Sequence, residues 1–321
     1  MMISANGIPI TDLMNKEEKS LDKNSFKDFA FEHGIKYLEH EELSKHTSFK
    51  IGGPAEIFAK PSSKKQVSEI VDYCKNNDVP LFPLGKGSNL LVSDNGINGV
   101  VMYFGSDFGK ISLLDEETIY CESGTSLGAL CNFALENELT GLEFAYGIPG
   151  SVGGAVFMNA GAYGGEIKDV IVFADHVDKN GESGRFTGEE LQMSYRHSAY
   201  SKKEYFITGA AFKLQKGEKS EIKAKMDDLL GRRFDKQPMD KPSAGSTFKR
   251  PEGAFASALI DQCGLKGYRV GGAEVSTKHA GFVVNIGGAT CADVLQLIED
   301  VKEKVKEETG FVLEPEVEIL R

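Results

Sequence analysis

The chain has 321 residues, of which 40% are hydrophobic and 26% are charged, and its formal net charge is −11. This length exceeds what one hydrophobic core needs and predicts two or three domains of a globular protein. The acidic balance argues against a nucleic-acid partner, which normally requires a basic surface.

Cysteine and histidine spacing predicts neither disulfides nor a metal site. The five cysteines form no C-x-x-C pair, and the six histidines show neither H-x-x-x-H nor H-E-x-x-H spacing. We therefore expect reduced, mostly buried thiols and no metal ion. Residues 1–12 contain no basic stretch and no long apolar run, so we expect no signal peptide, no membrane span and a cytoplasmic location.

The first predicted elements lead into a glycine-rich segment. Residues 20–45 are charged and predicted to be partly helical, and a further helix is predicted from Ser63. Its predicted buried face consists of Val67, Ile70, Val71 and Cys74. A strand over 79–84 then enters the segment Gly85–Gly99. The run LLVS within this segment and the run GVVMYF, which begins at Gly99, predict two more strands. Because no helix follows Gly87, this segment is neither a Rossmann G-x-G-x-x-G turn nor a P-loop.

The middle of the chain is predicted to alternate between helices and strands. One helix is predicted to end at Gly141, with strands following near 170–177 and 205–214. The residues with helical spacing before Gly141 are Leu127, Leu130, Ala134, Leu135 and Leu139. A composition shift near 213–219 predicts a domain boundary. The helix predicted after it has Ile222, Met226, Leu229 and Leu230 as its apolar positions and carries Arg232, Arg233 and Lys236 at its C-terminal end.

A last long helix is predicted to begin after Thr290, with Asp293 completing a capping box, and to end at Gly310. Its predicted buried face consists of Val294, Leu297, Ile298, Val301 and Val305. Residues 311–320 are predicted to form a strand. Helices and strands intermix along the whole chain without a regular βαβ alternation, which favours the α+β class.

Two glycine-rich segments are the strongest functional signal. Residues 147–165 contain seven glycines and no charge, and 85–99 has the same character. Glycine lets a ligand approach the bare backbone, and free N–H groups form anion-binding nests. Two such segments predict one extended, phosphate-bearing ligand held at two places. The alternative is that both are tight turns in a β-rich scaffold.

The order of short motifs along the chain resembles one enzyme family. These motifs are TSFKIGGPA (47–55), LGKGSNLL (84–91), GIPGSVGGA (147–155), NAGAYG (159–164), SYRHS (194–198), AGSTFKRP (244–251), KHAGFVVN (278–285) and LEPEV (313–317). From about Lys36 to the C-terminus the chain resembles the UDP-N-acetylenolpyruvoylglucosamine reductases. Because Tyr200 and Tyr205 lie close together, there is no room for a long Tyr-bearing insertion, and the chain is similar to the shorter, second-type branch.

The resemblance implies an α+β fold, with an FAD-binding fold of the vanillyl-alcohol-oxidase (PCMH) type in two subdomains and a C-terminal substrate-binding domain. We expect an N-terminal arm at 1–35, FAD-binding subdomains at 36–104 and 105–215, and the substrate-binding domain at 216–321. The implied cofactor-binding residues are Thr47, Gly52, Gly53, Gly85, Lys86, Gly87, Ser88, Asn89, Gly147, Ile148, Pro149, Gly150, Ser151, Gly153, Gly154, Asn159, Gly161 and Ala162.

The implied activity is NADPH-dependent, FAD-mediated reduction of UDP-N-acetylglucosamine enolpyruvate to UDP-N-acetylmuramate, in the synthesis of peptidoglycan precursors. Hydride passes from the flavin N5 to C3 of the substrate, and a proton is added at C2. FAD is expected to be bound non-covalently. The implied substrate-binding residues are Tyr163, Lys236, Lys249, Lys278 and Asn285. The alternatives are an FAD-dependent oxidase of the same fold and a non-catalytic flavin- or nucleotide-binding module.

Three residues are the implied catalytic groups, and each has a structural alternative. Ser246 is the implied proton donor, but a serine in this motif is also suited to cap a helix beginning near Pro251. Thr247 departs from the apolar residue often found in the family. Arg196 offers a planar fork to a carboxylate, although a single arginine commonly forms a surface salt bridge.

Glu316 is the third implied catalytic residue. In a strand, Glu314, Glu316 and Glu318 lie on one face, and this face is alternatively a solvated edge next to Pro315. Periodicity does not choose among the three carboxylates, and the P-E-V motif selects Glu316. Basic residues cluster at 232–236 and at Lys249, which suits a pyrophosphate. The alternative is that those of the helix end compensate its macrodipole, which accounts for Arg232 and Arg233 and leaves Lys236 and Lys249 as the ligand candidates.

Overall fold

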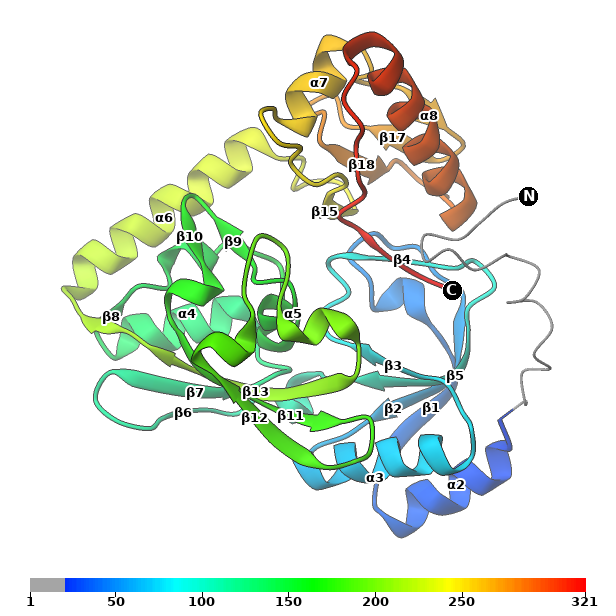
Figure 1. Ribbon diagram of the computed structural model, residues 1–321, viewed down its shortest axis with the longest axis vertical. Helices are drawn as coiled ribbons and strands as arrows, with labels where there is room; N and C mark the ends of the chain where they lie inside the picture. The colour runs from blue at the N-terminus through cyan, green and yellow to red at the C-terminus, as the bar shows by residue number, and fades with distance from the viewer. Residues whose placement is uncertain (1–20) are drawn as a thin grey trace.

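A computed structural model describes residues 21–321, which form three units, each with its own sheet (Figure 1). Residues 1–20, most of the expected arm, lie outside the described part. The first and second units lie side by side, and the third unit packs across one end of both. All five cysteines are free, and four of them are buried. No helix within 21–321 is long and apolar enough to cross a bilayer.

The first unit is a four-stranded sheet covered by two helices. The strand order is β1 (Lys36–Glu42), β2 (Pro54–Lys60), β5 (Ile97–Tyr103) and β3 (Leu81–Leu84). The helices α2 (Lys23–Glu32) and α3 (Lys64–Asn76) pack on the face of the sheet that carries Ile57 and Val100. Ser63 caps α3, and the four residues of its predicted face are buried, which confirms this helix. Phe26 of α2 is fully buried in the same core, although it lies in the expected arm.

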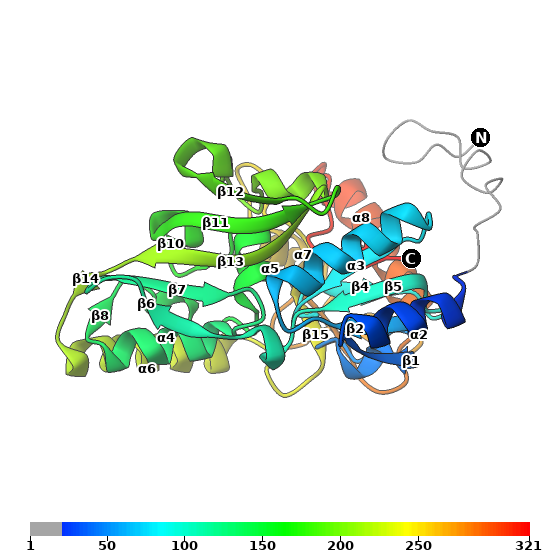
Figure 2. The ribbon, with the colours of Figure 1, turned by 90° about the horizontal axis from the view of Figure 1, so that it is seen from below.

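The second unit is an antiparallel five-stranded sheet. Its strand order is β12 (Ser183–Thr187), β11 (Ile171–Asp178), β13 (Tyr205–Lys213), β7 (Thr118–Glu122) and β6 (Ile111–Leu113). The helices α4 (Leu127–Glu136), α5 (Val152–Phe157) and α6 (Lys219–Lys236) belong to its core, and α4 and α6 lie together along one side (Figure 2). The expected boundary near 213–219 falls between β13 and α6. The first half of α6 nevertheless packs on the second unit through Ile222 and Met226.

The predicted helix that includes Leu139 is longer than the helix in the structure. The helix α4 ends at Glu136, because Asn137 caps it and donates its amide to the Phe133 carbonyl at 2.8 Å. Glu138 then turns the chain in a left-handed conformation, with φ 57°. Leu139 is buried as its spacing implied, but it lies in the short strand β8 (Leu139–Thr140), which pairs with β14 (Gln215–Lys216).

The third unit is a sheet with two helices. The strand order is β15 (Ser243–Ser246), β18 (Phe282–Asn285), β17 (Ala273–Val275) and β16 (Arg269–Val270), and the helices are α7 (Ala256–Gln262) and α8 (Cys291–Thr309). The capping box of Thr290 and Asp293, the left-handed Gly310 and all five predicted buried positions of α8 are present. The prediction of this helix is therefore confirmed from its first residue to its last.

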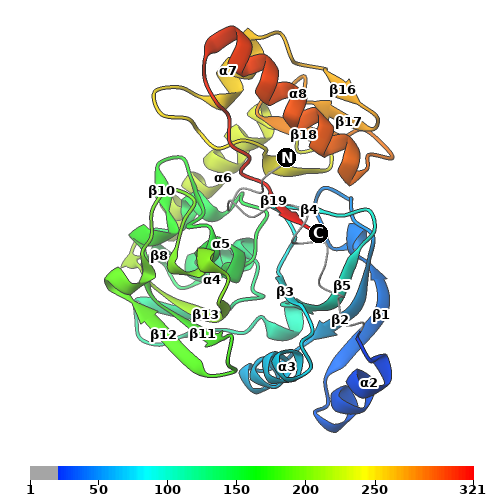
Figure 3. The same cartoon turned by 45° about the vertical axis from the view of Figure 1, so that its right-hand side comes forward.

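The C-terminal segment crosses from the third unit to the first (Figure 3). It forms a strand only at its end, where β19 (Glu318–Leu320) pairs in parallel with β4 (Leu90–Val92). Pro315 makes an isolated bridge with Phe248. The predicted strand over 311–320 is therefore too long, because the segment spans a gap between two sheets and finds ladder partners only at intervals.

Backbone and side-chain hydrogen bonds tie the third unit to the first. The Asp94 carboxylate accepts from the first free N–H groups of α8, those of Cys291 at 2.7 Å and Ala292 at 3.1 Å. An anion there satisfies orphan donors and the positive end of the helix dipole. Ser48 Oγ also donates to the Ser243 carbonyl at 2.6 Å. These contacts hold the third unit against the first unit.

Candidate functional site

The two glycine-rich segments meet in the structure. The first follows β3, and the second runs into α5. They pass so closely that a Cβ added to Gly85 would lie 2.3 Å from Ser151 Oγ. Glycine at 85 is therefore required for the approach of one segment to the other. The small two-stranded sheet of β9 (Gly161–Ala162) and β10 (Gly165–Glu166) forms at the C-terminal end of the second segment.

The glycines serve two different purposes. Gly87 is left-handed, with φ 58°, and a Cβ there would lie 2.2 Å from the His46 carbonyl oxygen. A Cβ at Gly53 would lie 2.2 Å from the Asp94 carbonyl oxygen. These two positions are dictated by packing within the chain. At Gly150 and Gly154 an added Cβ would meet no atom closer than 3.5 Å and 3.6 Å, so the bare backbone there leaves room for a ligand.

Burial sorts the expected cofactor-binding residues into two groups. Those that are buried even without a ligand are Thr47, Gly53, Gly87, Ser151 and Asn159. Those with exposed surface are Gly52, Gly85, Lys86, Ser88, Asn89, Gly147, Ile148, Pro149, Gly150, Gly153, Gly154, Gly161 and Ala162. The side chains of Thr47, Ser151 and Asn159 serve the scaffold: Thr47 Oγ1, for example, donates to the Ile51 carbonyl at 3.0 Å. Asn159 is fully buried, which leaves its side chain no surface for a cofactor contact.

Arg196 and Glu316 form an ion pair where the three units meet. Arg196 Nε lies 2.6 Å from Glu316 Oε1, and only 19% and 12% of the two side chains are exposed. Arg196 belongs to the second unit, in a turn closed by reciprocal backbone hydrogen bonds between Ser194 and His197. It has a left-handed backbone, with φ 54°, which is uncommon for a non-glycine residue. The alternative of a surface salt bridge for Arg196 does not fit this burial.

Ser246 is connected to this ion pair through a backbone hydrogen bond of the next residue, Thr247. The Glu316 N–H donates to the carbonyl of Thr247, the residue after Ser246, at 2.8 Å. The hydroxyl of Ser246 forms no hydrogen bond with any residue of 21–321. The helix-cap alternative is wrong, because α7 begins only at Ala256 and Phe255 occupies its N-cap. Thr247 itself is buried, and its Oγ1 accepts from the Val283 N–H at 3.0 Å, so the departure at 247 is accommodated.

The structure separates the three C-terminal carboxylates. Glu314 is 73% exposed beside Lys249, and Glu318 is 38% exposed beside Lys203. Glu316 is the least exposed of the three, with 12% of its side chain accessible. Burial raises the pKa of Glu316 above its ordinary value, although the charges of Arg196 and Lys249 and the hydrogen bond from Arg196 act in the opposite direction.

Arg233 is a candidate that the sequence argument set aside. Its neighbour Arg232 forms an exposed ion pair with Asp228, with Nη2 2.7 Å from Oδ2. Arg233 is instead largely buried, burial lowers its pKa, and its Nε has no partner among the described residues. A Cβ added to Gly147 would lie 3.1 Å from Arg233 Cδ. An unpaired buried guanidinium is costly, so this side chain points to an anionic ligand near the second glycine-rich segment.

A signal for Arg233 was present in the sequence. Met226, Leu230 and Arg233 follow one another at helical spacing, so the arginine continues the apolar stripe of α6. The macrodipole explanation is sufficient for Arg232 and is not sufficient for Arg233. The position of Arg233 within an apolar stripe is therefore more informative about its role than its position near the end of the helix.

Comparison with known proteins gives the family. The family model for the C-terminal domain of UDP-N-acetylenolpyruvoylglucosamine reductase matches residues 237–320, and an FAD binding domain matches 55–187. The UDP-N-acetylenolpyruvoylglucosamine reductase of Clostridium novyi (strain NT) is 50% identical over 96% of both chains. That of Lachnoclostridium phytofermentans is 52% identical over 88% of this chain and 92% of its own. This chain belongs to the UDP-N-acetylenolpyruvoylglucosamine reductase family.

A solved structure agrees with this assignment. The crystal structure of UDP-N-acetylenolpyruvylglucosamine reductase from Thermus caldophilus matches with a TM-score of 0.76 and 34% identity, over 89% of this chain and 99% of that one. The expected fold, an FAD-binding domain of the PCMH type followed by a C-terminal domain with mixed helices and strands, is confirmed.

The residues expected to bind substrate differ in how far their side chains are available to a ligand. Lys278 Nζ donates to the Phe234 carbonyl at 2.6 Å, which brings it to the end of α6 that carries the exposed Lys236. Tyr163 is 44% exposed, and Lys249 lies 3.5 Å from Glu314. Asn285 differs from these residues. Its amide is engaged by the Phe49 carbonyl and by the N–H groups of Gly287 and Ala289, so its side chain serves the scaffold.

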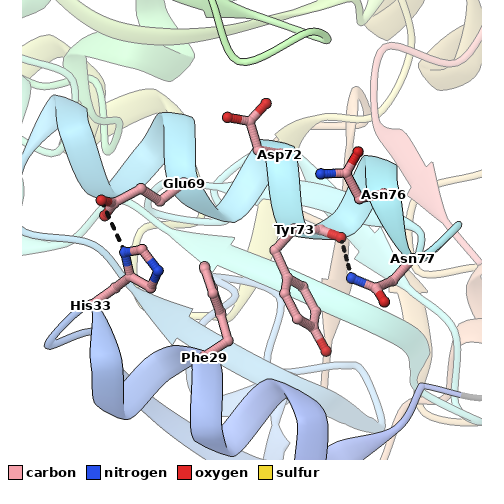
Figure 4. A pocket seen from close by; sticks show the side chains of 7 residues that line it. All are labelled: Phe29, His33, Glu69, Asp72, Tyr73, Asn76 and Asn77. Atoms are coloured by element: carbon pink, nitrogen blue, oxygen red, sulfur yellow. Dashed lines mark hydrogen bonds and ion pairs between the residues drawn. The ribbon is translucent and has the colours of Figure 1, made fainter.

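A surface cleft between α2 and α3 shares no residue with this site. It is lined by Phe29, Tyr73 and neighbouring polar residues, and in it His33 Nδ1 lies 2.9 Å from Glu69 Oε1 (Figure 4). Asn77 Nδ2 donates to the Tyr73 carbonyl at 2.8 Å, and the Tyr73 hydroxyl donates to Ser25 Oγ at 3.0 Å. Nothing in the cleft resembles the arrangement around Glu316.

The raised pKa of Glu316 predicts a pH-dependent effect on stability. A carboxyl whose pKa is higher in the folded than in the unfolded state stabilises the protein below its unfolded pKa, and this contribution is lost as the pH rises. Glu316→Gln removes it. The free energy of unfolding of this variant, measured by denaturant titration, should therefore rise relative to the parent as the pH is raised from about 4, near the ordinary pKa of a glutamate. Glu314→Gln is the control and should give a flat difference, since an exposed carboxylate contributes little. A flat or falling difference for Glu316→Gln would contradict the assignment.

Proposed function

We propose that this chain reduces UDP-N-acetylglucosamine enolpyruvate to UDP-N-acetylmuramate, using FAD and NADPH, in the synthesis of peptidoglycan precursors. The observation that carries the proposal is the part-buried Arg196–Glu316 pair, whose glutamate is joined by a backbone hydrogen bond to the residue after Ser246, in a chain whose relatives are reductases of this name. Nucleotide sugars of this kind and NADPH are intracellular metabolites, so we place the enzyme in the cytoplasm.

The residues present fit FAD. The bare backbone at Gly150 and Gly154, the partly exposed Ser88 and the exposed Lys86 would hold its pyrophosphate and ring without covalent attachment. Bound FAD would accept hydride from NADPH and deliver it to C3 of the enolpyruvyl group. The contributing residues come from the first two units, which we propose as FAD-binding subdomains at 36–104 and 105–215. Residues 216–321 are the proposed substrate domain, and 1–35 the proposed arm.

Arg196 is the proposed ligand of the enolpyruvyl carboxylate. Its Nε is held by Glu316, and its two terminal nitrogens form no hydrogen bond with any described residue. The planar fork therefore remains available to a carboxylate, and its charge would stabilise the negative charge that develops as C3 is reduced. Glu316 would keep the guanidinium in this orientation and contribute to the movement of protons in the site.

Ser246 is the proposed proton donor to C2. Its hydroxyl has no competing hydrogen bond, and the backbone hydrogen bond from Glu316 to Thr247 ties the strand of Ser246 to the segment that carries the ion pair. A serine hydroxyl is a weak acid in water but an adequate one toward a carbanion held against it.

Cations on and around α6 are the proposed anion ligands. Lys236 and Lys278 lie at its C-terminal end, and Lys249 and Tyr163 have exposed surface as well. We assign these four residues to the UDP moiety of the substrate. We assign Arg233, buried against Gly147, to an anionic group at the cofactor loop. The adverse overall charge of −11 makes such local cations necessary.

The flavin assignment predicts the effect of a side chain at Gly150. Gly150→Val has room in the ligand-free chain and should fold, but the new side chain would occupy the space of the cofactor. The purified variant should be largely colourless, with a melting temperature close to that of the parent freed of flavin. Gly231→Val, on the exposed face of α6, is the control and should keep its flavin absorbance. Full flavin occupancy in Gly150→Val would show that the cofactor lies elsewhere.

The proposed function is tested by following the two half-reactions in the absence of oxygen. The flavin absorbance of the parent should bleach with NADPH and recover on addition of UDP-N-acetylglucosamine enolpyruvate. Recovery with oxygen and an alcohol or hydroxy acid, but not with the enolpyruvyl substrate, would instead identify an oxidase.

The same experiment tests the role of Ser246. Ser246→Ala should be reduced by NADPH at the parent rate, because the hydroxyl has no part in that step. Its reoxidation by the enolpyruvyl substrate should be about 10²- to 10⁴-fold slower, the usual cost of losing a general acid. Ser243→Ala, at the other end of β15, is the matched control and should behave like the parent in both steps. Equal slowing of both half-reactions, or of neither, would refute the assignment.

A further inference from the structure

We propose that Asn89 and Asn159, the asparagines of the two glycine-rich motifs, are positioning residues that hold the Arg196–Glu316 pair from its two sides. The inference rests on the proposed function, since it concerns the residues assigned to the enolpyruvyl carboxylate. Both asparagines were expected to bind the cofactor. Their hydrogen bonds lead instead to the segments that carry the ion pair.

Asn159 holds the arginine side of the pair. Its Nδ2 donates to the Ser194 carbonyl at 2.9 Å and to Glu166 Oε2 at 3.0 Å, and its Oδ1 accepts from the Lys168 N–H at 2.9 Å. Ser194 closes the turn that projects Arg196. The pKa of Glu166 is lowered mainly by its hydrogen bond with Lys168, and the hydrogen bond from Asn159 and the positive charge of Arg196 lower it further. One buried amide therefore fixes both the turn that carries the guanidinium and a second carboxylate near it.

Asn89 holds the carboxylate side. Its Nδ2 donates to the Glu316 carbonyl at 3.1 Å, and its own carbonyl accepts from the Glu318 N–H at 2.9 Å. On the opposite side the Glu316 N–H donates to Thr247. The backbone of Glu316 is thus clamped between the first glycine-rich segment and the strand of Ser246. A displacement of Asn89 would therefore move the Glu316 carboxylate indirectly, through the Glu316 backbone.

The residue type matches this task. Asn159 has a φ of 43°, a left-handed conformation that asparagine tolerates better than most residues. Its side chain also offers both donor and acceptor groups in one plane. Catalysis by oriented groups is sensitive to displacement, and a misplacement of about 1 Å can cost about 10²-fold in rate. Loss of either asparagine should therefore appear in the step that uses the pair.

Asn159→Gly and Asn89→Ala in the flavin-loaded enzyme test the proposal. Glycine at 159 keeps the left-handed backbone and removes only the hydrogen bonds. Each variant should retain its flavin and its rate of reduction by NADPH, and its reoxidation by the enolpyruvyl substrate should be about 10- to 100-fold slower. Calorimetric binding of that substrate to the oxidised enzyme should also weaken. Asn137→Gly, which removes an amide hydrogen bond to a helix carbonyl outside the site, is the control and should match the parent.

Double-mutant cycles separate positioning from general damage. In an Arg196→Lys background, Asn159→Gly should add no more than a further factor of about two to the slowing, and Asn89→Ala should do the same in a Glu316→Gln background. If the losses of reoxidation rate in the two single variants multiplied fully in the double variant, the inference would be overturned. Loss of flavin, or an unchanged rate of reoxidation, in the single variants would overturn it as well. If Asn159→Gly does not fold, Asn89→Ala, which replaces a partly exposed side chain, tests the proposal alone. If Arg196→Lys and Glu316→Gln by themselves left turnover intact, the proposed roles of the pair would fail instead.

Discussion

The Arg196–Glu316 ion pair is the interaction on which the rest of the site depends. Its members lie 120 residues apart in sequence and belong to different units, so the pair forms only when all three units are assembled. Burial makes such a pair costly unless its remaining hydrogen-bonding groups are used. The free terminal nitrogens of Arg196 and the raised pKa of Glu316 fit a pair that is completed by a substrate carboxylate. The crossing of the C-terminal segment to β4, the Asp94 contacts with α8 and the two asparagines all serve to keep the pair in place.

Local signals were sufficient to predict most helices and strands. The start and buried face of α3 and the whole of α8 were predicted, because each helix combines a cap residue with an apolar stripe, and both signals are local. The errors at Leu139 and at 311–320 have the same cause: a correct apolar pattern continued past the point where the backbone changed conformation. Glu138 turns in a left-handed conformation, and the C-terminal segment has ladder partners only at intervals. Neither the left-handed turn at Glu138 nor the intermittent pairing of the C-terminal segment is strongly indicated by the sequence.

The site could be predicted from sequence only in part. The motifs identified Arg196, Ser246 and Glu316, but periodicity alone did not distinguish Glu316 from Glu314 and Glu318, since the difference lies in burial by distant segments. Arg233 was explained by the helix dipole, whereas its environment is set by the second glycine-rich segment. Asn159 and Asn285 lie in motifs that suggest ligand contact, and their side chains instead bond to the backbone of other segments. Three-dimensional neighbours decide such roles, and a single sequence does not contain them.

The central claim is that the position of the Glu316 carboxylate, and not only its charge, makes the site work. Glu316→Asp tests this most directly, because it keeps the charge and withdraws the carboxylate by one methylene, away from Arg196 Nε at 2.6 Å. The rate of flavin reoxidation by the enolpyruvyl substrate should fall by about 10²-fold, with reduction by NADPH unchanged. Reoxidation at the parent rate in Glu316→Asp would contradict the account.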